Sequence, residues 1–63
     1  MRYECELVLR GGLEEKRAPH TFSVAVTPGT ALHLEGVDWV IVEVNERDGL
    51  VPEVVARRPT SST

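Results

Sequence analysis

Apolar and polar residues alternate along much of this chain with a period of two. In residues 2–10 every second position is apolar or aromatic, and these positions are Tyr3, Cys5, Leu7 and Leu9. Residues 21–26 alternate in the same way, with the apolar positions Phe22, Val24 and Val26. Because successive side chains of a strand point to opposite faces, both stretches are predicted to be half-buried β-strands.

The densest apolar stretch is residues 32–44, which also contain the only tryptophan. Residues 31–35 are predicted to form a short strand, and Glu35-Gly36 is the turn signal that leads into a longer one. Strict alternation in the longer strand places one set on the core face, namely Val40, Val42 and Val44. It places Trp39 and Ile41 on the opposite face.

The remaining segments carry turn signals. Residues 11–20 open with two glycines, are charged in the middle and have no apolar period, so they are predicted to be a long loop. Residues 27–30 read Thr-Pro-Gly-Thr, which indicates a type II turn, and residues 46–49 end in Asp-Gly, a hairpin signal. A last strand is predicted over residues 50–58, where Pro52 requires a sheet edge or a bulge.

These elements predict an all-β fold. No stretch has a helical period over three turns, and five short strands are too few for a two-sheet sandwich. We expect a small, partly open barrel of five antiparallel strands, since closure reduces the number of exposed sheet edges. The expected domain is residues 1–58, and the polar residues 59–63 are expected to be a flexible tail.

The turn and hairpin residues carry a resemblance to a known family. Pro28-Gly29-Thr30, Leu32-x-Leu34, Gly36 and Trp39-Val40-x-Val42-x-Val44 resemble the corresponding elements of small bacterial SH3-like barrels. The predicted loop at residues 11–19 is similar to the long first loop of that fold, and the chain is also similar to short proteins of phages and actinobacteria. The resemblance implies a fold. It implies no peptide-binding role, because the clustered aromatic residues of eukaryotic SH3 domains are missing.

Size and charge narrow the classes of function. A domain of 63 residues buries only roughly 60% of its unfolded surface, and a single cysteine excludes an intrachain disulfide, so self-association is expected. The formal net charge of −3 argues against a dedicated nucleic-acid binder and against a polybasic membrane-surface protein. There is no apolar run of membrane-spanning length and no export signal near the N-terminus, which favours a cytoplasmic location.

For each residue considered for catalysis, cofactor binding or metal binding, a purely structural role is the favoured interpretation. Cys5 lies on the apolar face of a strand, where a buried thiol is expected. His20, His33 and Cys5 lack the paired spacing of a zinc site, although a site shared across a dimer remains open. Several carboxylates are expected to be solvated: Glu14, Glu15, Asp38, Glu43 and Asp48.

Four residues are candidates for interaction. If Trp39 and Ile41 face outward, they form an apolar patch of the kind that marks an interface. The alternative, given equal weight, is that other segments of the same chain cover them. Arg57 and Arg58, with Arg47 expected nearby across the hairpin, form a basic cluster for nucleic acid or an acidic partner; a solvated strand end is the favoured alternative.

The sequence therefore favours a non-enzymatic module that associates with itself or with a partner protein, without cofactor. The alternatives are a nucleic-acid-binding barrel, by analogy of fold, and an accessory component of a larger enzyme or phage assembly.

Overall fold

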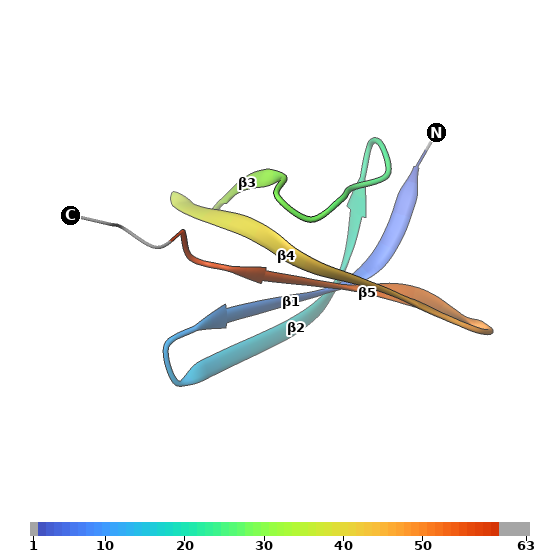
Figure 1. Ribbon diagram of the computed structural model, residues 1–63, viewed down its shortest axis with the longest axis horizontal. Helices are drawn as coiled ribbons and strands as arrows, with labels where there is room; N and C mark the ends of the chain where they lie inside the picture. Colours follow the sequence, from blue (N-terminus) through green and yellow to red (C-terminus); the bar gives the residue numbers. More distant parts are fainter. Residues whose placement is uncertain (1, 60–63) are drawn as a thin grey trace.

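The computed structural model describes residues 2–59 and forms one five-stranded β-sheet that curves into a half-barrel (Figure 1). The strands are β1 (Tyr3–Gly11), β2 (Glu14–Phe22), β3 (Ala31–Leu34), β4 (Val37–Arg47) and β5 (Leu50–Arg57). Their order across the sheet is β2-β1-β5-β4-β3. The all-β prediction with five strands is confirmed. Residues 60–63 of the predicted tail lie outside the described residues.

The prediction of a purely antiparallel sheet is wrong, because β1 and β5 run parallel at its centre. The other neighbouring strands are antiparallel. The chain passes from β2 to β3 through residues 23–30, and these two strands do not pair, so they remain as the two edges of the sheet. A period of two reveals the faces of a strand but not the direction of its neighbour, and for this reason alternation alone did not identify the mixed sheet.

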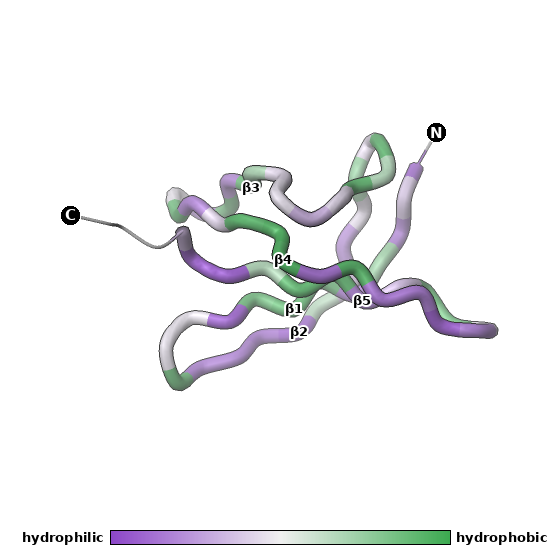
Figure 2. Tube along the Cα trace, in the orientation of Figure 1, coloured by the Kyte–Doolittle hydropathy of each residue, from purple (hydrophilic) through white to green (hydrophobic). Residues whose placement is uncertain are grey.

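The loop predicted at residues 11–20 is also wrong. The chain reverses at Gly12 and Leu13, and β2 then pairs with β1 over its whole length. Gly12 has a φ of 64°, which fits a two-residue hairpin turn with glycine in its first central position. The charged first half of β2 forms a sheet edge, as Figure 2 shows, so it lacks the apolar period by which a strand is recognised. The next predicted strand, 21–26, ends at Phe22.

Two of the predicted turns are confirmed in detail. Residues 27–30 form a turn in which the Thr30 amide donates to the Thr27 carbonyl at 3.2 Å and Gly29 has a φ of 95°, as a type II turn requires. Glu35 and Gly36 both have positive φ, 49° and 77°, which is the signature of a type I′ hairpin. The strand β3 between them has Leu32 and Leu34 packed towards the core, as predicted.

The core face of β4 is the reverse of the one that we predicted. Ile41 pairs with Ala56 and Glu43 pairs with Val55, so Val42 is an extra residue in a β-bulge. The bulge shifts the alternation by one residue. Trp39 and Ile41 therefore face the core before it, and Val44 faces the core after it. Val42 is 42% exposed. The predicted core set was right only at Val44.

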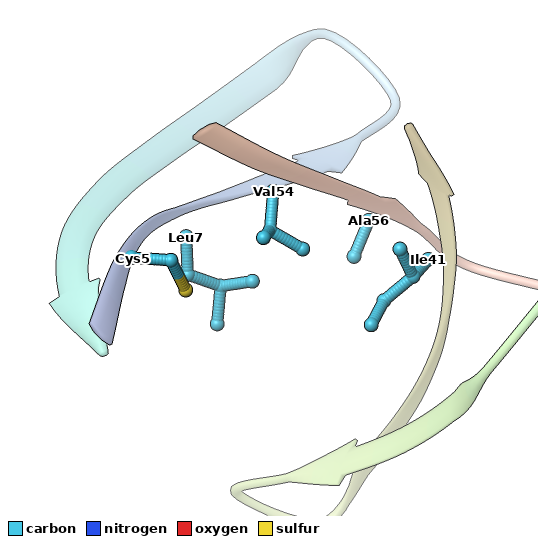
Figure 3. Close-up of a cluster of buried hydrophobic side chains, with 5 residues drawn as sticks. All are labelled: Cys5, Leu7, Ile41, Val54 and Ala56. Carbon is cyan, nitrogen blue, oxygen red and sulfur yellow. The ribbon is translucent and has the colours of Figure 1, made fainter. Parts of the chain in front are cut away.

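The core lies on the concave side of the half-barrel. Its buried members come from the three central strands, and Figure 3 shows them directed to the same side: Cys5, Leu7, Ile41, Val54 and Ala56. Tyr3 and Phe22 pack against this cluster from neighbouring register positions. Two further valines, Val8 and Val55, are buried on the convex side, where they are register partners. The central strands are thus covered on both faces.

The molecule is extended for its length. Its radius of gyration is 11.7 Å, against about 10 to 11 Å for a compact chain of this size. The hairpin of β4 and β5 projects at one end, where Leu50 is 65% exposed (Figure 1). Pro52 lies here, before the ladder with β1 begins and beside a register irregularity with β4. The expectation of an edge or bulge at Pro52 is therefore confirmed.

Candidate interaction cleft

The half-barrel leaves a cleft of about 670 Å³ on its concave side. Two hairpin turns form its lips: Gly12 at the end of β1 lies on one side and Glu35 at the end of β3 on the other. Both turns lie at the left of Figure 1, with the end of β5 between them. The cleft exists because β2 and β3 do not pair, so the sheet stays open along this side.

The floor of the cleft is apolar. It is lined by side chains from β1 to β4: Leu7, Leu9, Ala18, Leu34, Val37 and Trp39. Trp39 is partly buried, and its indole ring lies beside Gly11, where an added Cβ would stand 3.7 Å from Cη2. The indole ring thus lies close to the end of β1, at a distance where an added Cβ would make an ordinary van der Waals contact. A cleft of this volume with an apolar floor and a few polar groups is typical of a binding site.

The rim of the cleft carries charges of both signs. Its ionisable members are Glu14, Lys16, His20, Glu35 and Arg58. Among residues 2–59, none of the four charged ones takes part in an ion pair. His20 packs edge-on against Phe22, with ring centroids 4.5 Å apart. The rim can therefore meet a partner that carries both signs of charge.

The convex face differs in its electrostatics. Arg17 on β2 donates to Glu53 on β5 at 2.9 Å and to Glu15 at 3.1 Å, and its side chain spans β1 because that strand lies between β2 and β5. Hydrogen bonds from Arg10 and Arg17 lower the pKa of the Glu15 carboxyl, and those from Arg17 and Asn45 lower the pKa of Glu53. Arg17 stands opposite Val8 in the register, so these ion pairs lie over the buried valines.

The structure separates the four predicted interaction residues. Ile41 is completely buried in the core, and Trp39 lines the cleft floor, so the two are covered by the same chain to different extents. Arg58 lines the cleft and also a second hollow of about 380 Å³, where Arg57 joins it. Arg47 was expected to join this basic cluster, but it lies at the other end of β4, where it donates a hydrogen bond to the Val51 carbonyl. Arg10 stands beside Arg57 instead.

The residues considered for catalysis or metal binding lie apart. Cys5 is buried in the core, and this burial raises the pKa of its thiol, which favours the thiol over the reactive thiolate. His20 is its register partner on β2, whereas His33 is exposed on β3 and lies 2.7 Å from Asp38. Within residues 2–59, no three His, Cys, Asp or Glu side chains gather in a way that would hold a metal ion. The same residues contain no helix long and apolar enough to cross a membrane.

Sequence reasoning missed the residues that β2 brings to the cleft. Glu14 and Lys16 were assigned to a loop, yet they occupy successive concave positions of a strand. The signal available was Gly12, since glycine at the first central position favours a two-residue hairpin turn, after which residues 14–22 match the first strand in length. Leu13, fully exposed at the hairpin tip, was missed for the same reason.

Comparison with protein-family models, with curated proteins and with solved structures finds no match to this chain.

Proposed function

We propose that this protein is a small non-enzymatic interaction module whose concave cleft binds a protein chain. The observation that supports this function is the unclosed half-barrel, which leaves a cleft of about 670 Å³ with an apolar floor between two hairpin tips. Exposed apolar surface rimmed by polar groups is characteristic of protein interaction sites. A cytoplasmic location, and a role as an accessory part of a larger assembly, are compatible with such a module.

A relation to the small SH3-like barrels remains a proposal. The turn at residues 27–30 and the β3–β4 hairpin, whose residues suggested it, have the expected conformations. The parallel pairing of β1 with β5 and the short β1–β2 turn depart from what that resemblance implied. A fold likeness of this kind carries no function by itself.

Peptide selection tests the proposed function. A displayed library of random peptides should yield binders to the full chain, and binding should be lost in Val37→Glu, which places a charge on the cleft floor. Val42→Glu is the matched control, because Val42 is exposed in the β4 bulge. Circular dichroism checks that both variants keep their strands. Failure to select any binder, or binders that tolerate Val37→Glu, would contradict a protein-binding cleft.

Nucleic acid binding is a second candidate because Trp39 and Arg58 line the same cleft. Aromatic stacking combined with a cationic side chain is how many proteins hold single strands. Glu14 and Glu35 on the rim oppose this function, since they would repel phosphates. Retention on immobilised single-stranded DNA at low salt, lost on Arg58→Ala, would support it. No retention at low salt would end it.

A further inference from the structure

The turn between β1 and β2 exposes a leucine at the mouth of the cleft. Leu13 has a relative exposure of 106%, so its side chain is not covered by any described residue. Leu13 itself lines the adjoining second hollow, and its neighbours Gly12 and Glu14 line both this hollow and the cleft. A polar residue would serve this turn equally well, because the hairpin requires only the positive φ of Gly12. The monomer therefore gives no structural reason for an apolar side chain here.

The charges beside Leu13 are self-complementary. The rim contains two acids, Glu14 and Glu35, and two bases, Lys16 and Arg58, none of them in an ion pair among residues 2–59. A second copy of the same rim presents the same mixture. In a two-fold contact each acid can meet a base of the other copy, whereas a partner of one charge sign would leave half of the rim unmatched.

The exposed area of the chain is large enough for such a contact. The accessible surface is 4817 Å², against about 4,000 Å² for a compact monomer of 7.0 kDa. The chain therefore exposes more surface than a compact monomer of its mass, and a standard stable interface needs about 800 Å² from each partner. The core offers little in compensation, since seven hydrophobic side chains are buried within residues 2–59 and Cys5 is a free thiol. Small domains with such limited cores often gain stability through association.

The two sheet edges are poor places for a second copy to bind. Four consecutive charged residues begin the edge strand β2, and Pro19 lacks a backbone donor further along it. The other edge, β3, has only four residues. Charge, proline and shortness are the features by which edge strands avoid pairing with other chains. The cleft is thus the better surface.

We infer that the cleft binds a second copy of this chain in a closed two-fold dimer, an inference that rests on the proposed function. The two half-barrels clasp each other at their open ends. Leu13 of each copy enters the cleft of the other and covers its floor beside Trp39. Because the contact is isologous, both clefts are filled and assembly stops at two chains.

Sedimentation velocity of the full chain, from micromolar to millimolar concentration, tests this dimer. The wild type should sediment as a dimer, and Leu13→Glu should raise the dissociation constant by about a hundredfold or more, because each dimer loses a buried leucine contact twice. Leu13→Glu should leave the monomer intact, since the Leu13 side chain is fully exposed in it. Leu50→Glu, at the exposed tip of the opposite hairpin, is the matched control and should remain dimeric.

The single tryptophan adds a second measurement. In the wild type, iodide should quench Trp39 fluorescence less strongly as the protein concentration rises, because the dimer covers the cleft floor. In Leu13→Glu the quenching should be the same at all protein concentrations. A monomer at every concentration would overturn the inference. A dimer that tolerates Leu13→Glu, a dimer broken equally by Leu50→Glu, or an open polymer would also overturn it. If the chain is monomeric but selected peptides bind and Val37→Glu blocks them, the dimer fails and the protein-binding cleft stands.

Discussion

The convex face and the concave cleft both carry charged side chains, but among residues 2–59 ion pairs form on the convex face and not at the cleft rim. On the convex side Arg17 bonds glutamates from three strands, namely Glu6, Glu15 and Glu53. On the cleft rim Glu14 and Lys16, which are neighbours of these residues on β2, have no ion pair among residues 2–59. The charges around Arg17 on the convex face are thus paired within the chain, whereas those of the cleft rim are available to a second molecule. The comparison can be tested by substitutions on each face.

The largest effect on stability is expected at the β-bulge of β4, which turns Ile41 towards the core and Val42 towards solvent. Ile41→Ala should lower the free energy of unfolding by about 2 to 5 kcal/mol, because Ile41 is completely buried in the core. Val42→Ala should change it by less than about 0.5 kcal/mol, since Val42 is exposed in the bulge. Urea denaturation followed by circular dichroism measures both. Equal losses of stability in the two variants, or a larger loss in Val42→Ala, would contradict the bulge. Such a result would favour the original prediction that Val42 faces the core.

The next largest effect concerns the convex face. Val8→Ala should lower the free energy of unfolding by about 2 kcal/mol, because Val8 is fully buried beneath the ion pairs of Arg17. Val24→Ala is the control and should have little effect, since Val24 is 66% exposed. The same denaturation experiment compares them. A neutral Val8→Ala would show that the convex face is solvated in spite of its ion pairs.

A smaller change, this time an increase in stability, is expected at the turn between β3 and β4, which forms one lip of the cleft. Glu35 has a φ of 49°, a conformation that is strained for a residue with a side chain. Glu35→Gly should therefore raise the free energy of unfolding by about 0.5 to 1 kcal/mol. Gly36→Ala should lower it, because Gly36 also has positive φ. Thermal denaturation of the two variants should show shifts of opposite direction.

The smallest effect compares adjacent cations on the two faces. Arg17→Met should destabilise the monomer slightly and more at low salt than at high salt, because it removes exposed ion pairs. Lys16→Met should leave the stability of the monomer unchanged. Both variants are measured in the Leu13→Glu background, so that dimer formation does not contribute. Equal losses in the two variants would remove the proposed difference between the faces.

The pH dependence follows from the same convex ion pairs. Glu15 and Glu53 have native pKa values below the ordinary value of 4.5, so the unfolded chain binds protons more readily than the native chain in acid. Their contribution to stability is present above pH 4.5 and decreases as the pH falls through the lower native values. Arg17→Met should flatten this acid limb of the stability profile. An unchanged acid limb would mean that Arg17 does not set these pKa values.

Much of the local structure was predictable because it depends on neighbouring residues. The strand β1, the turns at residues 27–30 and 35–36, and the inward leucines of β3 follow from alternation and from the conformational freedom of glycine. Trp39 was singled out from its size and position, although its environment was left open between core and interface. The structure places it between the two, on the floor of a cleft.

Only the tertiary structure decided which residues share a surface. The bulge at Val42, the parallel pairing of β1 with β5, and the strand made from the charged residues of β2 depend on contacts between segments far apart in the chain. A local pattern contains no information on such contacts, because the same alternation fits either direction of a neighbouring strand and a one-residue bulge exchanges its faces. The sequence by itself determined strands and turns, whereas pairing determined which side of β4 is core and where the cleft opens.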